Sequence, residues 1–345
     1  PLAEITKEDV YSKYLSYAGK KMALVAYGNI HHEWLIAMAN YYYRPVNLES
    51  LTRLGNEIGL DLSTINTISG QTSFDIAATS QYIFQQVVIN AILPFTERYQ
   101  LPVILTGGGA LNVLLNEKLR TLPCPVFVPV NPNDCGLSFG MMCLRNPPTE
   151  TVNISYSGFG ILDKHKLPDY AERFKARPTH IRELARLLCS GKIIGVMRGN
   201  SECGPRSLGN RSILAWPSAG MNDRLNQIKN REPWRPVAPI VRLQDAEVYF
   251  SPACVSPFMS YAPWVNEPYR DKVPAIVHKD GTARVQTVTE EQNEFLYYLL
   301  SCVEVISDIG ILINTSFNIK GKPILTTIED AIEVWQTTDI DCIYI

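Results

Sequence analysis

Residues 199–212 read Gly199-Asn200-Ser201-Glu202-Cys203-Gly204-Pro205-Arg206-Ser207-Leu208-Gly209-Asn210-Arg211-Ser212, and we expect the fold to be organised around them. Apolar runs at 192–197 and 213–217 predict buried strands on either side of this loop. Glycine lets backbone N–H groups converge on an anion, and arginine forks suit phosphate or carboxylate. A surface loop with helix caps is the alternative for a single glycine-rich run. Two further polar segments downstream favour a binding site.

The composition bounds the class of protein. A chain of 345 residues with 46% hydrophobic and 19% charged residues suits two soluble globular domains. The net charge of −2 gives no overall electrostatic footprint for nucleic acid, although a local groove is compatible with it. No run approaches 18 apolar residues and the start, Pro1-Leu2-Ala3-Glu4, is not a signal peptide, so we expect a cytoplasmic protein without membrane insertion. The start also lacks Met, so we expect the N-terminus to lie upstream.

The cysteines and histidines give no clear metal or redox motif. None of the eight cysteines forms a CxxC pair, which argues against zinc knuckles and thioredoxin-type sites and favours reduced thiols. Cys203 lies among arginines, where a nucleophile is conceivable, but a chance cysteine in a binding loop is the favoured interpretation. His31 and His32 are adjacent and do not share a helix face, so packing or surface roles are favoured over a ligand pair.

The first part of the chain predicts helices followed by two strand–turn–helix units. We expect helical structure over 5–45, interrupted near Gly28, and a long helix over 72–99. A strand at 102–105 leads into the glycine triplet 107–109 and a helix that begins at 111. Strand, glycines and helix N-terminus can seat a phosphate or nucleotide, although close packing of strand on helix explains a triplet equally well.

The second such unit carries an aspartate at its turn. A strand at 126–130 leads into the turn 131–136 and a helix from 137. Asp134 has the place of a helix N-cap, and it also lies where α/β folds place ligands, at the carboxyl end of a strand. The repeat suggests the second half of an actin/hexokinase-like (ASKHA) nucleotide fold. The paired hairpins and phosphate loop of a first half are not found in the sequence.

Beyond a predicted linker at 146–149, the second domain gathers cations that few acids match. We expect a helix over 181–190, then the strand at 192 and the central loop. The cations in or near three polar segments are Arg206, Arg211, Lys229, Arg231, Arg235 and Arg284, against the acids Glu202, Glu232 and Asp280. Unmatched cations at strand ends indicate an anionic ligand with several oxygens, such as a phosphate chain. Ser316 and Asn318 can fix a small planar polar group. His278 is either an acid/base or binding group or a structural histidine.

Four segments then resemble a known family. The resemblance rests on residues 203–212, 231–236, 278–286 and 314–318, which occur in the order found in the O-carbamoyltransferases of antibiotic, toxin and nodulation-factor biosynthesis. Residues 1–150 are similar to part of that family's first domain, which is related to threonylcarbamoyl-transfer proteins of tRNA modification. Residues 151–345 resemble its YrdC-like domain, an α/β fold that forms carbamoyl adenylate, and 315–318 look like its Ser-x-Asn motif.

The resemblance implies an ATP-dependent carbamoyltransferase. Carbamoyl phosphate and ATP would give carbamoyl adenylate, which passes to a hydroxyl on a small molecule or a hydroxymethylated nucleobase. The catalytic residues implied are Lys229, Arg231, Ser316 and His278. The substrate and phosphate ligands implied are Arg206, Arg211, Ser212, Arg235, Asp280, Arg284, Asn314 and Asn318. In the first domain, Gly107, Gly108, Gly109 and Asn112 would hold nucleotide, and Asp134 would hold a divalent metal, Fe²⁺ or Mg²⁺.

The chain also departs from the family pattern. Its similarity to the family's first domain begins near residues 19–22, after the half that carries a phosphate loop and a metal-binding histidine pair. His31-His32 lack the His-x-x-x-His spacing. The chain is therefore expected to be a fragment or a larger subunit that a small subunit completes, in a homo- or hetero-oligomer. The alternatives are a threonylcarbamoyl-type tRNA modification protein and a non-catalytic nucleotide-binding regulatory subunit.

Overall fold

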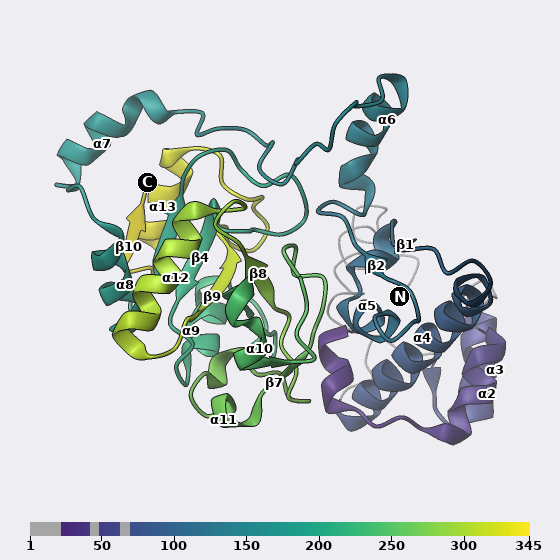
Figure 1. The fold of residues 1–345 in the computed structure, drawn as a ribbon. Helices are drawn as coiled ribbons and strands as arrows, with labels where there is room; N and C mark the ends of the chain where they lie inside the picture. Colours follow the sequence, from purple (N-terminus) through teal and green to yellow (C-terminus); the bar gives the residue numbers. More distant parts are fainter. Residues whose placement is uncertain (1–21, 42–47, 63–69) are drawn as a thin grey trace. The chain divides into compact units, whose positions relative to one another are not determined.

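The computed structural model describes residues 22–41, 48–62 and 70–345. The chain divides into a first unit, residues 1–103 and 118–125, and a second unit, residues 104–117 and 126–345 (Figure 1). The boundary expected at residue 150 falls inside the second unit. The division into an actin-like half and a YrdC-like domain stays a prediction, as does the helix expected over 5–21 and 42–45, which lies outside the described residues.

The first unit is helical. Its elements are η2 (Val25–Tyr27), α2 (His32–Tyr41), α3 (Leu48–Ile58) and α4 (Gln71–Tyr99). Trp34, Ile58 and Leu62 form a small buried core because apolar residues recur on facing sides of these helices. The helix predicted over 72–99 is confirmed as α4. By length and composition alone α4 could also cross a membrane, but core helices of soluble proteins meet the same criterion.

The second unit begins with short strands and helices. These elements are β1 (Val103–Ile104), η4 (Gly108–Leu111), α5 (Val113–Leu119), β2 (Val126–Phe127), η5 (Asp134–Gly136), α6 (Leu137–Arg145), η6 (Lys164–Lys166) and α7 (Leu167–Arg173). Tyr261 joins residues 110–128 to the rest of the second unit. Its hydroxyl donates to Val126 O at 2.7 Å, and its ring packs with Ala110 and Val128. The helix expected from residue 111 begins at 113, because a 3₁₀ turn occupies 108–111.

A six-stranded mixed sheet forms the centre of the second unit. Its strands are β3 (Ile194–Met197), β4 (Arg211–Ala215), β5 (Ala238–Arg242), β8 (Gln286–Val288), β9 (Ile311–Ser316) and β10 (Cys342–Tyr344). The strand order is β10-β3-β4-β9-β5-β8, and β6 (Phe250–Ser251) pairs separately with β7 (Trp264–Val265). The pairs from β3 to β5 are antiparallel, whereas both edge pairs are parallel. The expected α/β class is therefore confirmed.

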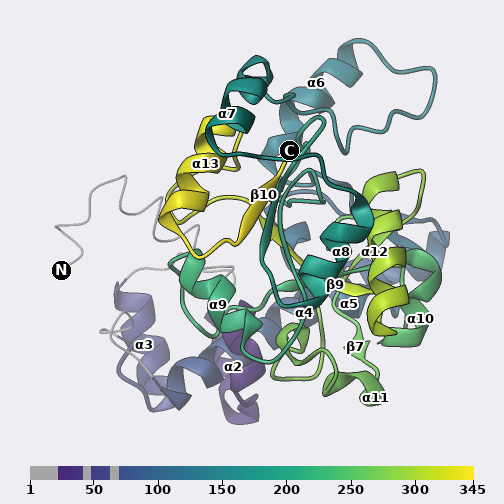
Figure 2. The same ribbon diagram turned by 90° about the vertical axis from the view of Figure 1, so that its left-hand side faces the viewer.

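Helices cover both faces of this sheet. The remaining elements are α8 (Ile181–Cys189), α9 (Met221–Ile228), η7 (Leu243–Asp245), α10 (Ala246–Tyr249), α11 (Glu267–Arg270), η8 (Pro274–Ile276), α12 (Glu294–Ser307) and α13 (Ile328–Thr337). Residues of α8 and α12 pack on one face, and α9 and α13 lie on the other (Figure 2). Residues of α10 belong to the same buried cluster as those of α9 and α13. Both faces are buried, so the strands read as continuous apolar runs in the sequence.

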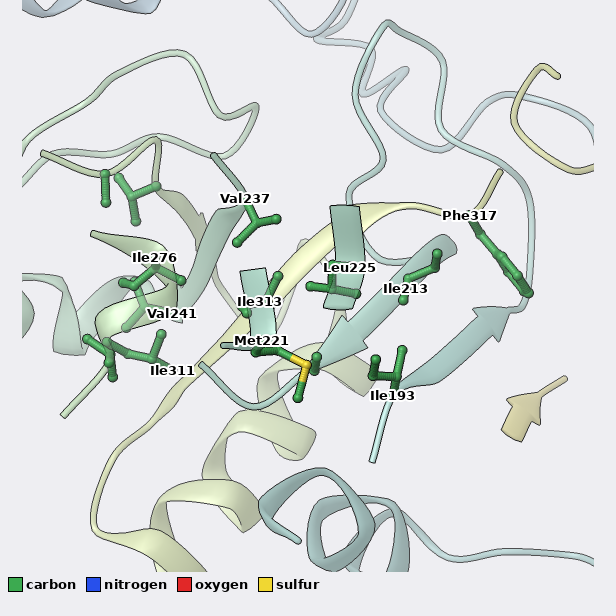
Figure 3. Close-up of a cluster of buried hydrophobic side chains, with 14 of the residues drawn as sticks. Ile193, Ile213, Met221, Leu225, Val237, Val241, Ile276, Ile311, Ile313 and Phe317 are labelled. Carbon is green, nitrogen blue, oxygen red and sulfur yellow. The ribbon is translucent and has the colours of Figure 1, made fainter. Parts of the chain in front are cut away.

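Alternation along the strands decides which face each side chain joins. In β4, Ile213 belongs to the α9 face and Leu214 to the α12 face, and β9 repeats this with Ile313 and Leu312. Figure 3 shows the α9 face, where Met221 and Leu225 of α9 meet the strand side chains and Phe317 follows β9. The two cores hold the sheet rigid, and the sheet holds in place the polar loops at its strand ends.

Candidate anion-binding site

Lys229 is the best-defined polar group at these strand ends. It follows α9, and its ammonium group donates to Ser316 Oγ at 3.0 Å and to Asn318 Oδ1 at 2.8 Å. The carbonyl oxygens of Ser316 and Asn318 accept from it at 2.5 and 3.1 Å. Three residues predicted for the site, from two separate segments, are thus brought together, because α9 packs beside the end of β9.

The charge of Lys229 is poorly stabilised. Burial is the largest influence on it, and the nearby Arg231 and Arg235 add repulsion, which together lower the pKa of Lys229 to about 7. Among the described residues, only neutral oxygens contact its amine. An anion bound nearby would favour the protonated form, so this lysine couples proton binding to ligand binding.

Arg206, Arg231, Arg235 and Arg284 form a guanidinium cluster next to Lys229. Burial and then Arg235 lower the pKa of Arg231 to about 10, and burial followed by Arg206, Arg231 and Arg235 lowers the pKa of Arg284 well below its usual value. Burial and Arg235 likewise lower the pKa of Arg206. These mutual effects place the four arginines, which come from three separate segments, within one region.

The cluster lacks compensating acids. Arg235 pairs with Glu232 at 3.7 Å, whereas no carboxylate of the described residues lies within salt-bridge distance of Arg206, Arg231 or Arg284. Within the same part of the chain, Arg231 Nη2 and Arg284 Nε are buried without a hydrogen-bond partner. Buried donors of this kind cost free energy until an acceptor reaches them. The arrangement can therefore bind an anion with several oxygens.

Asn226 is a site residue that the sequence analysis missed. It is buried in α9, and its Oδ1 accepts from Arg231 Nε. Its Nδ2 donates to Pro233 O and to Arg235 O, each at 2.9 Å. Asn226 therefore fixes the loop that carries two of the four arginines. Asn226 directly follows Leu225 and so lies off the apolar face of α9, and no local sequence pattern distinguished it.

Arg211 does not join the cluster as expected. It lies in β4, fully buried, and its guanidinium donates to four carbonyl oxygens, those of Arg198 at 2.6 Å, Asn210 at 2.8 Å, Gly199 at 3.1 Å and Phe159 at 3.3 Å. These bonds occupy both of its terminal nitrogens. The expected phosphate ligand is instead a support for the central loop, because the strand begins two residues earlier than predicted and turns the side chain inward.

Glu202 supports the same loop from the other side. Its Oε1 accepts from Leu208 N at 2.7 Å, Asn210 N at 2.7 Å and Arg211 N at 3.3 Å. The carboxylate thus gathers backbone donors that glycine-rich loops usually offer to a ligand. The loop folds back so that residues 208–211 reach Glu202, and spacing in the sequence does not reveal this contact.

Ser212 and Asn314 fasten the central loop to the sheet. Ser212 Oγ lies 2.6 Å from Ser207 Oγ, and Asn314 Nδ2 donates to Ser207 O at 3.2 Å and to Gln286 Oε1 at 2.6 Å. Gln286, which the sequence analysis did not assign to the site, donates to Leu208 O at 3.0 Å. Their predicted role as phosphate ligands stays a prediction, and the side-chain bonds that the structure shows are internal.

His278 and Asp280 lie in one tight turn. His278 Nδ1 is 2.9 Å from Thr282 Oγ1, and Asp280 Oδ1 accepts from Thr282 N at 3.0 Å and from Thr282 Oγ1 at 2.7 Å. Burial lowers the pKa of His278 to about 4, with Arg284 acting in the same direction against the opposing effect of Asp280. His278 is therefore a neutral imidazole beside the cluster, and Asp280 orders the turn.

The residues predicted for nucleotide and metal take no part in the hydrogen bonds described above. Gly107 has φ +83°, and a Cβ on Gly107 or Gly108 would meet no atom within 4 Å, so their outer side is open. Asn112 Oδ1 accepts from Leu115 N at 2.9 Å and so caps α5. Asp134 is exposed at the start of η5, and the described ranges contain no group of three His, Cys, Asp or Glu suited to a metal.

Comparisons with known proteins agree with the sequence resemblance. Residues 185–345 match the family model of the carbamoyltransferase C-terminus. Nodulation protein U of Sinorhizobium fredii is 31% identical over 351 residues, covering 95% of this chain and 62% of that protein. Nodulation protein NolO of Bradyrhizobium diazoefficiens is 32% identical over 297 residues, covering 77% of this chain and 52% of that protein.

Coverage of these relatives is partial. The chain spans 62% and 57% of the length of the first two Nodulation protein U sequences that it matches. A crystal structure of full-length HypF in the phosphate- and nucleotide-bound form is similar with a TM-score of 0.35 and 18% identity, over 52% of this chain and 27% of that one. That likeness is too low to carry an argument.

Proposed function

The chain belongs to the O-carbamoyltransferase family, and from this premise we propose that its second unit binds carbamoyl phosphate and ATP and forms carbamoyl adenylate. The observation that carries the proposal is the guanidinium cluster around Lys229, which has buried donors and too few acids. The phosphates of both substrates supply the missing acceptor oxygens. The whole protein would then transfer the carbamoyl group to an acceptor hydroxyl.

The proposed reaction balances with one water. Water attacks the carbonyl carbon of carbamoyl phosphate, the bond from that carbon to the phosphate oxygen breaks, and carbamate and phosphate result. A carbamate oxygen then attacks the α-phosphorus of ATP, and the bond to the β-phosphate oxygen breaks to release pyrophosphate. Arg231, Arg235 and Arg284 would neutralise the developing oxyanions, and Lys229 would hold a phosphate oxygen from the Ser316 side. Transfer releases AMP as the acceptor oxygen attacks the carbonyl carbon.

The metal proposed for acceptor transfer does not fit the described residues alone. Asp134 offers one carboxylate, and His31, one of the two adjacent histidines, is held by Asp75 Oδ2 and Glu33 Oε1, each at 2.8 Å. One ligand does not make a divalent site. We therefore derive no step through a metal, and adenylate formation is the part of the reaction that this chain's own residues support.

Pyrophosphate release is the direct test. The purified chain is incubated with ATP, with and without carbamoyl phosphate, and no acceptor is added. We expect release that depends on carbamoyl phosphate and falls at least about 100-fold in Arg231→Ala and Ser316→Ala, the loss typical of removing one charge-stabilising group. Arg182→Ala, at an exposed arginine of α8, is the matched control and should retain the wild-type rate.

Four results would contradict the proposal. Release that ignores carbamoyl phosphate would indicate an ATP pyrophosphatase, and release driven by threonine and bicarbonate would favour the threonylcarbamoyl-type alternative. Tight ATP binding without pyrophosphate release under any condition would favour the non-catalytic regulatory subunit. A fall in Arg182→Ala equal to that in Arg231→Ala would show that the loss is not specific to the cluster.

A further inference from the structure

The buried amide of Asn226 supplies one acceptor and two donors to the loop that follows α9. Its Oδ1 accepts from Arg231 Nε, and its Nδ2 donates to Pro233 O and Arg235 O, each at 2.9 Å. A longer contact of 3.3 Å joins Nδ2 to Asn222 Oδ1. Turning the amide over would place a donor against Arg231 Nε and an acceptor against two carbonyl oxygens. Aspartate can only accept and leucine can do neither, so the contacts require an amide.

These contacts fix the direction of the Arg231 side chain. Arg231 N also donates to Asn226 O at 3.0 Å, so the main chain and the side chain of Arg231 are held by one residue. Arg231 Nη2 is buried and has no hydrogen-bond partner among the residues that the structure describes. Because the guanidinium is planar and rigid, holding Nε also fixes where Nη2 points. Asn226 therefore leaves a fixed donor of Arg231 for an acceptor from outside the chain.

Arg242 in β5 is held in the opposite way. Its Nε donates to Asp245 Oδ2 and its Nη2 to Glu304 Oε2, each at 2.5 Å, so two carboxylates compensate its charge. Burial acts to lower the pKa of Arg242, but the two acids outweigh it and raise this pKa above its usual value. Arg231 has a neutral amide at its Nε, and burial followed by Arg235 lowers its pKa to about 10. The amide thus orients Arg231 without compensating its charge.

We propose that Asn226 is a positioning residue of the anion site, which aims Arg231 and anchors the loop as far as Arg235 while leaving both positive charges to the ligand. This inference rests on the proposed function, in which these two arginines neutralise developing oxyanions. An aspartate at position 226 would still accept from Arg231 Nε, but its charge would compete with the ligand for the guanidinium. It would also leave the carbonyl oxygens of Pro233 and Arg235 without their donor.

Pyrophosphate binding, measured by isothermal titration calorimetry at pH 8, tests the role of the neutral amide. Asn226→Asp is nearly isosteric, and we expect it to bind pyrophosphate about 10-fold or more weakly than the wild type, the loss typical of one hydrogen bond to a charged group. Gln227→Glu adds the same charge at the next residue of α9, where the side chain is exposed. This matched control should stay within about 2-fold of the wild type, because solvent screens an exposed charge.

Proton uptake separates positioning from a general loss of stability. After burial, the charge of Arg231 is the largest cause that lowers the pKa of Lys229 to about 7. A carboxylate on Arg231 would offset this repulsion, so Lys229 would hold more of its proton at pH 8 before the ligand binds. Pyrophosphate should therefore bind to Asn226→Asp with less proton uptake than to the wild type or to Gln227→Glu, as measured in buffers of different ionisation enthalpy. A change that only reduced the folded fraction, which urea denaturation reports, would leave the uptake per bound ligand unchanged.

A double-mutant cycle tests whether Asn226 acts through Arg231. Asn226→Ala removes the amide without adding a charge, and we expect it to weaken pyrophosphate binding about 10-fold in the otherwise wild-type chain. Where Arg231 is already replaced by alanine, the same change should cost at most about 3-fold, because residues that share one interaction are not additive.

The other outcomes are distinguishable. A wild-type chain that neither binds pyrophosphate nor releases it from ATP with carbamoyl phosphate would overturn the proposed function and this inference with it. Wild-type affinity in Asn226→Asp would overturn this inference and leave the proposed function standing. Equal losses in Asn226→Asp and Gln227→Glu would show that the added charge acts at long range. Additive losses in the cycle would show that Asn226 does not act through Arg231, and either of these results also overturns the positioning role.

Discussion

The depressed pKa of Lys229 predicts that anion binding takes up a proton. Burial and the neighbouring Arg231 and Arg235 lower this pKa from 10.5 to about 7, so the ligand-free chain carries roughly one tenth of a proton at Lys229 at pH 8. A phosphate next to the amine favours its charged form. If the bound pKa lies well above 8, binding at pH 8 takes up about 0.9 proton, and binding at pH 6 takes up about 0.1.

The affinity for the anion should therefore depend on pH. It stays constant below pH 7 and falls by up to about 10-fold per unit as pH rises above 7, because the free chain must then gain the proton that the complex holds. Without ligand, the unfolded chain binds this proton up to pH 10.5, so Lys229 makes the free energy of unfolding rise with pH between about 7 and 10.5. This contribution of Lys229 to the free energy of unfolding decreases again as the pH falls from 10.5 towards 7.

Calorimetry in buffers of different ionisation enthalpy measures the proton uptake. Pyrophosphate is the probe, titrated at pH 6 and pH 8 into wild type, Lys229→Arg and the control Lys164→Arg, which alters an exposed lysine. Lys229→Arg keeps a cation that does not titrate in this range, so the difference between it and wild type cancels protons bound by the ligand itself. Equal proton uptake by wild type and Lys229→Arg at pH 8 would refute the reasoning.

Two stability predictions follow from the loop and the core. Glu202→Ala leaves the backbone donors gathered by its Oε1 without a partner, so urea denaturation should show a loss of about 3 kcal/mol or more, and an unchanged midpoint relative to the exposed control Glu172→Ala would contradict the assigned role. A Cβ on Gly195 would lie 2.4 Å from Phe317 Cζ, so Gly195→Ala should lose about 1–3 kcal/mol, and the double mutant with Phe317→Leu should lose less than the sum of the single changes. Additive losses would show that the ring is not what excludes the methyl group.

The amino-acid pattern was sufficient where the signal is local. Continuous apolar runs predict strands that are buried on both faces, and β3, β4 and β9 appear where such runs stand. The 3.6-residue periodicity from residue 72 predicts α4 to within one residue at its start. The excess of cations over acids predicts an anion site, because a folded chain does not bury unpaired charge without a ligand that compensates it.

The roles within the site depended on three-dimensional contacts. Arg206 and Arg211 are five residues apart in one loop and look equivalent in sequence, yet one joins the cluster and the other binds carbonyl oxygens of the central loop and the segment before it. Arg211 is the first residue of β4, whereas Arg206 lies in the loop before this strand. Spacing in the sequence does not fix where the strand begins.

The sequence by itself predicted the α/β class of fold, the resemblance to the O-carbamoyltransferases and an anionic ligand. The fold class and the excess of cations depend on composition and periodicity, and the resemblance depends on four motifs; these signals act over a few residues or sum over the chain. Only the tertiary structure decided that Lys229 meets Ser316 and Asn318, that Asn226 holds Arg231, and that Nε2 of His278 is buried without a partner among the described residues. These pairings join groups through hydrogen bonds and burial, and the free energy of such contacts depends on distances that only the packed sheet and helices set.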